Sequence, residues 1–169
     1  MISPDLVQTM AAYNRWQNTS LYSAADGLDE TARRLDRGAF FGSVHETLAH
    51  ILWADQLWLS RFGGCDKPSG GIKQSTARYP DWTSLKSARD IADQHFTDWT
   101  DRLSQSDLAG DLSWFSGAAN QTVSRPRWLL IQHMFNHQTH HRGQVHAMLT
   151  QAGARPDDTD LFLMPSLMS

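Results

Sequence analysis

The sequence predicts an all-α fold, a four-helix bundle with a short hairpin or irregular insertion before the last helix. Three observations support this class. Four long segments repeat apolar residues at three- and four-residue steps, as helices with one buried face do. Capping residues or prolines stand at the start of each segment, and glycines follow three of them. Helices of about twenty residues that share one core most simply form a bundle.

The first two helices are marked at both ends. Ser3-Pro4-Asp5 suits a helix start, because serine can cap, proline fits the first turn and aspartate favours the positive end of the helix dipole. The first helix is predicted from residue 4 to about 25. Residues 28–41 then form a connection with some turn structure. The second helix follows the capping-box pattern Ser43-Val-His-Glu46 and ends near Phe62, before Gly63-Gly64.

The second half of the chain alternates loops with helices. Residues 63–80 are rich in glycine and proline and predict a loop. Asp81 can cap a third helix over residues 82–103. Residues 108–124 lack a helical period and favour a short β-hairpin. The last helix is predicted from Pro126 to about Gln151. The apolar tail over residues 157–169 is expected to pack on the domain or on a second subunit.

Bulk properties restrict the class of protein. The chain has 169 residues, 40% of them hydrophobic, with a net charge of −3 and seven tryptophans. These values predict one folded domain over residues 1–169 and argue against a nucleic-acid partner. Cys65 is the one cysteine, so no internal disulfide is possible, which favours a reducing compartment. The chain start lacks signal-peptide features and no apolar run is long enough for a membrane span, so a cytoplasmic protein without a membrane partner is predicted.

Histidines give the strongest functional clue. His137 and His141 are four residues apart on the last predicted helix, which places both imidazoles on one face, one turn apart. At about 100° per residue, both point into the apolar face, whereas His133 lies at its edge. On the second helix, His50 shares a face with Trp53 and Leu57 and also points inward. Three inward histidines from two helices predict either a transition-metal site with open positions or a core in which each imidazole is hydrogen-bonded separately.

Two polar residues could assist such a site. Glu46 lies one turn before His50, and its alternatives are a metal ligand, a general base or the second half of the capping box. Gln144 follows His141 by three residues and could accept a hydrogen bond from the free ring nitrogen of a ligand, or it could simply lie at a polar helix edge.

Motifs in every predicted helix except the third resemble the DinB-like (YfiT-like) metalloenzyme family. The most specific is the segment Asn136-His-Gln-Thr-His-His141-Arg-Gly-Gln144. Weaker similarities are Tyr13-Asn-Arg-Trp-Gln-Asn18 in the first helix, Glu46-Thr-Leu-Ala-His50 with Trp53-Ala-Asp55 in the second, and Gly153-Ala-Arg-Pro156 near the end. Together they cover nearly the whole chain.

The resemblance carries further implications. It implies a four-helix bundle, often a homodimer, in which one histidine of the second helix and a His-x-x-x-His pair of the last hold a divalent metal. Here these are His50, His137 and His141. Family members of known activity include isomerases and S-transferases that use a low-molecular-weight thiol, which implies such a thiol as a cosubstrate here.

Two functions are compatible with these residues. The first is a metal-dependent enzyme of thiol S-transferase or hydrolase type, acting on a small molecule through a metal-bound water or thiolate, with Glu46 and Gln144 as helpers. The metal would be zinc or nickel, with iron or manganese as alternatives. The second is a non-catalytic metal-binding module for stress response or interaction. A closed site with a fourth ligand, His133 or Glu46, would support the second function.

Overall fold

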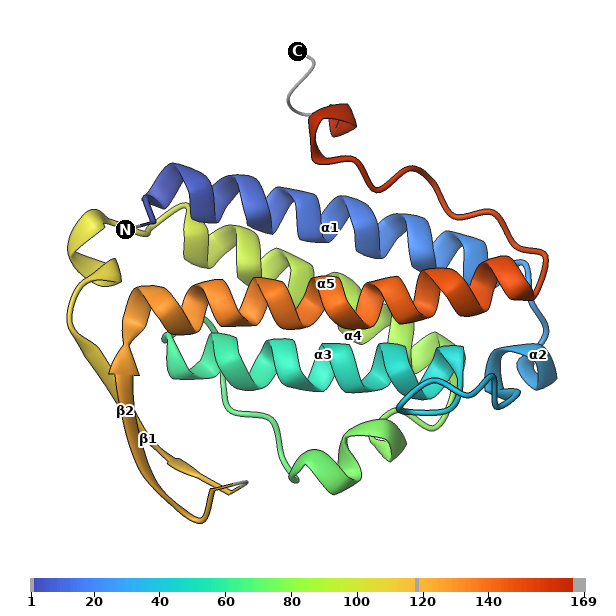
Figure 1. Ribbon diagram of the computed structural model, residues 1–169, viewed down its shortest axis with the longest axis horizontal. Helices are drawn as coiled ribbons and strands as arrows, with labels where there is room; N and C mark the ends of the chain where they lie inside the picture. Colours follow the sequence, from blue (N-terminus) through green and yellow to red (C-terminus); the bar gives the residue numbers. More distant parts are fainter. Residues whose placement is uncertain (1, 118, 166–169) are drawn as a thin grey trace.

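Four long helices form the body of the protein. The computed structural model describes residues 2–117 and 119–165 and shows these helices lying side by side (Figure 1). They are α1 (Pro4–Asp26), α3 (Val44–Arg61), α4 (Trp82–Thr100) and α5 (Arg127–Gln151). Helices α1 and α3 both pack against α4 and α5. The bounds agree with the predicted helices within a few residues at each end.

The connections contain shorter elements. The strands β1 (Asp111–Ser116) and β2 (Gln121–Pro126) pair antiparallel, with Asp111 opposite Pro126 and Ser116 opposite Gln121. An all-α class was therefore too narrow, because residues 111–126 form strands as the predicted hairpin required. The protein is mainly helical with a small two-stranded sheet. The remaining elements are α2 (Glu30–Arg34) and the short 3-10 helices η1 (Ile72–Ala77), η2 (Gln105–Leu108) and η3 (Leu161–Leu163).

Side-chain caps begin three of the four long helices. Ser3 accepts a hydrogen bond from Leu6 N at 3.2 Å, and Asp81 accepts one from Ser84 N at 2.8 Å. Ser43 likewise accepts from the backbone N–H of Glu46, at 3.3 Å.

The predicted capping box is only half formed. The Glu46 carboxylate does not return to the backbone of Ser43 and instead accepts a hydrogen bond from Arg34 at 2.7 Å. The reason is the neighbouring helix α2, which presents the Arg34 guanidinium to this carboxylate. In this ion pair both partners are charged, whereas in a capping-box bond with a backbone N–H only the carboxylate is.

A buried polar layer divides the core into two apolar clusters. One cluster contains Leu52 of α3 and Leu149 of α5, and the other contains Phe96 of α4 and Met134 of α5. The polar layer lies between them, and each long helix contributes to it. Its members are Asn14, Asn18, Asp55, Arg89, Asp93, Gln138 and Arg142.

Charge is balanced inside this layer. Arg89 pairs with Asp55 at 2.6 Å and with Asp93 at 2.7 Å, and all three side chains are almost fully buried. Asn18 donates a hydrogen bond to Asp93 at 3.0 Å, while Arg142 donates one to Asn14. Buried charges of this kind require partners, because an unpaired one would lose its hydration without compensation.

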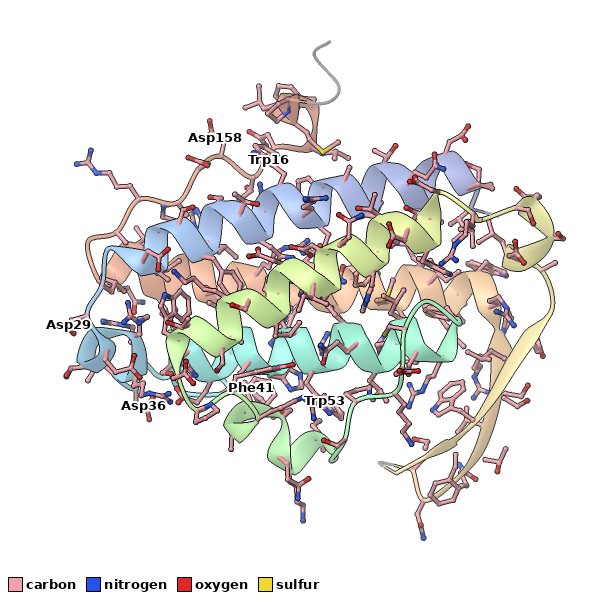
Figure 2. The ribbon with its side chains drawn as sticks, turned by 180° about the vertical axis from the view of Figure 1, so that it is seen from behind. Trp16, Asp29, Asp36, Phe41, Trp53 and Asp158 are labelled. Carbon is pink, nitrogen blue, oxygen red and sulfur yellow. The ribbon has the colours of Figure 1, made fainter. Side chains whose placement is uncertain are left out.

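The segment after α5 runs back along α1. Gln17 donates to the backbone oxygen of Asp158 at 2.9 Å, and Tyr13 donates to that of Thr159. Figure 2 shows Asp158 and Trp16 on this edge, on the opposite side of the molecule from Phe41 and Trp53. The tail thus packs on its own chain up to Met164, which is 2% exposed. Residues 166–169 of the predicted apolar tail lie outside the described part.

Over residues 2–117 and 119–165, no helix combines sufficient length with a sufficiently apolar composition to cross a bilayer.

Candidate metal centre

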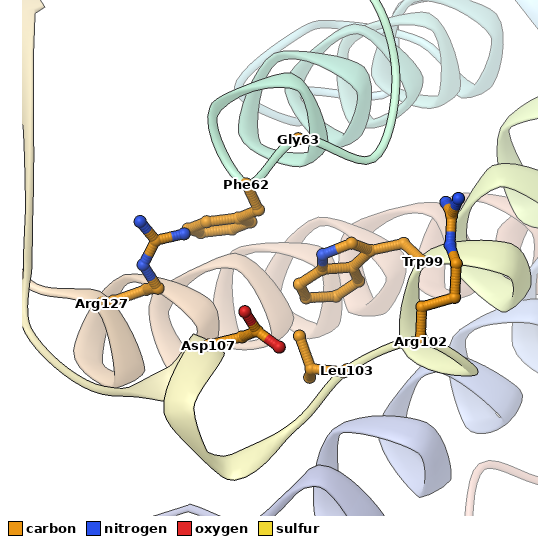
Figure 3. Close-up of a pocket in the computed structure, with 7 residues that line it drawn as sticks. All are labelled: Phe62, Gly63, Trp99, Arg102, Leu103, Asp107 and Arg127. Carbon is orange, nitrogen blue, oxygen red and sulfur yellow. The ribbon is translucent and has the colours of Figure 1, made fainter.

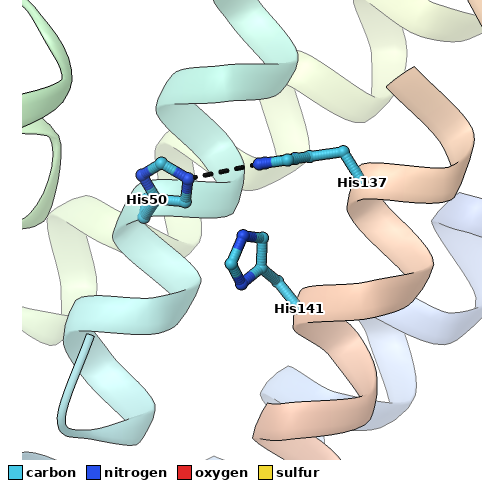
Figure 4. A group of neighbouring side chains, drawn as sticks. All are labelled: His50, His137 and His141. Atoms are coloured by element: carbon cyan, nitrogen blue, oxygen red, sulfur yellow. Dashed lines mark hydrogen bonds between the residues drawn. The ribbon is translucent and has the colours of Figure 1, made fainter. Parts of the chain in front are cut away.

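Three histidine side chains converge between α3 and α5. His50 comes from α3, and His137 and His141 come from α5 (Figure 4). One ring nitrogen from each lies within 4.8 Å of the others. The Nε2 atoms of His50 and His137 are 3.4 Å apart. The structure therefore brings together the three residues that the helical periodicity selected.

The opposite directions of the two helices explain this meeting. His50 contacts the rings of His137 and His141, whereas Trp58, two turns further along α3, contacts His133, which lies earlier on α5. The helices are therefore antiparallel along this seam. The i, i+4 spacing places His137 and His141 on one face of α5, where their rings meet edge to face with centroids 4.5 Å apart.

Hydrogen bonds fix the tautomers of two of the rings. Ser75 donates its hydroxyl hydrogen to Ile72 O at 2.8 Å and is left to accept from Nδ1 of His50 at 2.9 Å. Gln144 Oε1 accepts from Nδ1 of His141 at 2.8 Å. Each bond places the ring proton on Nδ1, so the lone pair on Nε2 points to the shared centre.

The surroundings keep the rings neutral. Burial, with the nearby charges of His137 and His141, lowers the pKa of His50 to about 3. Burial, with the neighbouring histidines, lowers the pKa of His137 to about 4. Burial also lowers the pKa of His141, although the hydrogen bond that Gln144 accepts from this ring opposes the shift. Imidazoles must be deprotonated to bind a metal, and these meet that condition at neutral pH.

One side of the group is covered by an aromatic ring. Phe41 stacks on His50 with 3.9 Å between ring centroids and lies 5.4 Å from the ring of His141. His50 is 2% exposed and His141 is 7% exposed, whereas His137 is only half-buried. The group is therefore accessible mainly on the side of His137.

The donor set fits a divalent transition metal. Tetrahedral ligands at about 2.0–2.1 Å from a zinc ion are separated by about 3.3 Å. The 3.4 Å between the Nε2 atoms of His50 and His137 is close to this value. Three neutral imidazoles in a partly desolvated position, two of them with the Nε2 lone pair directed at the shared centre, match the donor set of an open three-histidine site.

Other residues considered from the sequence do not join the group. Glu46 is held by Arg34, and His133 packs its ring on Trp58 at 5.2 Å. His140 is exposed, with Nε2 3.3 Å from the side-chain nitrogen of Gln144. Within the described residues, the cluster of possible ligands at this centre contains only the three histidines.

Sequence reasoning missed two residues that shape the site. Ser75 belongs to η1, in a segment predicted as a plain loop, and Phe41 belongs to the connection before α3. No periodicity applies to either segment, so nothing local indicated that these side chains return to His50.

A separate hollow lies at the end of α3 and is not part of this site. Its volume is about 190 Å³ (Figure 3). None of the seven residues that line it is a histidine. They are Phe62, Gly63, Trp99, Arg102, Leu103, Asp107 and Arg127.

Fold and site together define a mainly helical protein with a group of three histidines that could hold a metal ion. The chain belongs to the DinB family, whose sequence model matches residues 1–167. It is 26% identical over 170 residues to protein DinB of Bacillus subtilis (strain 168), with 94% of each chain covered. It also resembles the crystal structure of a DinB-like protein from Bacillus cereus ATCC 10987. That match has a TM-score of 0.63 and 18% identity, and covers 85% of this chain and 90% of the other.

Proposed function

We propose that this protein is a metal-dependent enzyme in which His50, His137 and His141 hold a divalent metal within a four-helix bundle. The observation that carries the proposal is the convergence of three neutral imidazoles, two of which are held in one tautomer by Ser75 and Gln144. Isolated core histidines have no need of such an arrangement, since each could satisfy its nitrogens separately.

A metal held there would supply Lewis acidity, which lowers the pKa of a coordinated water or thiol. The residues of the chain perform the remaining tasks. Ser75 and Gln144 orient the ligand rings, and Phe41 excludes water from one side of the site. Half-buried His137 leaves access for a small molecule on the other side. We propose thiol S-transfer or hydrolysis as the reaction type, with zinc or nickel as the metal.

Access to the group argues for the catalytic alternative over a non-catalytic metal-binding module. A purely structural site is closed by a fourth protein ligand. In the described residues, both candidates for that role, His133 and Glu46, have other partners.

Elemental analysis of untagged protein tests the proposal. We expect about one metal per chain after loading with zinc or nickel, and loss of this metal in His137→Ala/His141→Ala. The control His95→Ala/His146→Ala removes two histidines outside the group and should keep the metal. A wild-type protein that retains no metal after loading, or a control that loses it equally, contradicts the proposal.

A further inference from the structure

A cationic and aromatic cluster adjoins the accessible side of the three histidines. It consists of Arg61, Trp58, Trp114 and His133. The ring of His133 is 6.1 Å from that of His137 and 5.2 Å from that of Trp58. The two tryptophans meet edge to face at 5.7 Å. The cluster thus continues the seam between α3 and α5 from the metal centre toward the hairpin, which extends from the end of the molecule where α5 begins (Figure 1).

Arg61 is fixed within this cluster by its aromatic neighbours. Its guanidinium carbon lies 4.4 Å from the ring centre of Trp58 and 5.3 Å from that of Trp114. Contacts of this kind hold a guanidinium in one orientation while leaving its N–H groups free at the edge. Arg61 is also the last residue of α3, where the helix dipole favours a cation.

In the described part of the chain, the charge of Arg61 has no acidic partner. Among residues 2–117 and 119–165, no carboxylate forms an ion pair with Arg61, and none of its N–H groups donates a side-chain hydrogen bond. Burial alone lowers the pKa of Arg61, which remains charged at any physiological pH. By contrast, Arg34 and Arg89 each bind a carboxylate.

We propose that Arg61 binds the carboxylate of a small molecule whose other end reaches the three histidines. A guanidinium fork matches a carboxylate in two parallel hydrogen bonds. The faces of Trp58 and Trp114 would pack against the apolar body of the same molecule. This inference rests on the proposed function and names the class of its substrate or thiol cosubstrate.

The distance between Arg61 and the three histidines sets the length of the ligand. Arg61 follows His50 by eleven residues, which is about 16 Å along the helix axis. Side chains lean toward the helix N-terminus, so the guanidinium lies nearer the histidines than its backbone does. The ligand should therefore span about 10–15 Å.

Calorimetric titration of zinc-loaded protein with 8-mercaptooctanoate and 8-mercaptooctan-1-ol tests this. We expect the wild type to prefer the carboxylate at least about tenfold. In Arg61→Gln the ratio of the two affinities should fall close to one. Arg61→Lys should retain part of the preference, because lysine keeps the positive charge but cannot form the two parallel hydrogen bonds of a guanidinium. Arg125→Gln is the matched control, since it removes the same charge from the exposed hairpin, and should leave the preference unchanged. Equal binding of the two thiols by the wild type, or equal loss in the control, overturns the inference.

A second measurement separates this inference from the metal proposal. Metal-free wild type is titrated with hexanoate and hexan-1-ol while the indole N–H signals of Trp58 and Trp114 are followed by NMR. We expect hexanoate alone to shift these signals, and Arg61→Gln to abolish the shift. This result would support the carboxylate site even if elemental analysis found no metal. Absence of the shift in the wild type overturns it, whatever the metal content.

Discussion

Gln138 donates a hydrogen bond to the carboxylate of Asp55, with 2.8 Å between Nε2 and Oδ1. Both side chains are fully buried. Gln138 directly follows His137 on α5, and Asp55 lies beyond His50 on α3. The bond therefore fixes the two helices against each other beside the candidate metal centre. The same carboxylate also pairs with Arg89 of α4, so three helices meet at one acidic group.

Removal of the Asp55 carboxylate should destabilise the fold strongly. In Asp55→Ala, Arg89 loses one of its two buried partners and Gln138 loses its acceptor. We expect the free energy of unfolding to fall by about 3–5 kcal/mol, measured by urea denaturation. Glu30→Ala is the control, because Glu30 is half exposed where it pairs with Arg34, and should cost at most about 1 kcal/mol. Similar losses of unfolding free energy in the two variants would show that the buried ion pair stabilises the fold no more than the exposed one.

Gln144 should influence metal affinity without being a ligand. Gln144→Leu removes the acceptor that holds the ring proton of His141 on Nδ1. Loss of such a partner weakens metal binding by about 10–100-fold, and competition with a chelator would measure it. The comparison is Gln132→Leu on the same helix, where the side chain bonds only to Asn136. Unchanged affinity in Gln144→Leu would mean that this hydrogen bond does not prepare the site.

Acid should destabilise the metal-free protein through its buried histidines. The pKa of His50 is lowered to about 3 and that of His137 to about 4, whereas both are about 6.5 in the unfolded chain. Between these limits the unfolded state binds more protons, so the free energy of unfolding decreases as pH falls from about 6.5 toward 4. Above pH 6.5 neither ring contributes to the slope.

Urea denaturation at pH 7, 6 and 5 measures this slope. Each histidine can contribute up to about 1.4 kcal/mol per pH unit, less what residual solvation removes. The variant His50→Asn/His137→Asn carries no titrating ring at these positions and should show a flatter dependence. The difference between the two proteins isolates the histidines from Asp55, whose pKa is raised by burial. If the free energy of unfolding depended on pH equally in the two proteins, the lowered pKa values of His50 and His137 would be contradicted.

The convergence of the three histidines was predictable because helical periodicity is local. Four residues separate His137 from His141, and His50 shares a stripe with Trp53, so each inward direction follows from the sequence of one helix. Phe41 and Ser75 were not predictable, because they lie in connections whose return to His50 depends on how several helices pack.

The partners of several charged residues were not predictable from the sequence for a related reason. Glu46 fitted a capping box, yet the short helix α2, which the sequence marks weakly, supplies Arg34 as a better partner. Asp55 and Arg89 sit within amphipathic helices, where a charge ordinarily indicates the solvent side. They are buried because they pair with each other across two helices that are far apart in the sequence. The sequence of either helix alone does not indicate this pairing.

Substitution of Gly143 tests whether a second copy of the chain packs on α5, as it could in the predicted homodimer. A glycine inside a helix such as α5 is often explained by the close approach of another helix. In the single chain, however, a Cβ at Gly143 would meet nothing within 4 Å. Gly143→Ala should therefore raise the free energy of unfolding by up to about 1 kcal/mol, because alanine favours the helical backbone.

Gly64→Ala provides the contrast, because there an added Cβ would lie 2.5 Å from Cδ1 of Leu59 and 3.2 Å from Cβ of Trp99. Crowding of this kind costs about 1–3 kcal/mol. Urea denaturation of both variants, at several protein concentrations, compares them. If Gly143→Ala instead lowered stability, and did so more at high protein concentration, a second copy of the chain would be packing on this face of α5. The glycine would then be explained by the dimer and not by the fold of one chain.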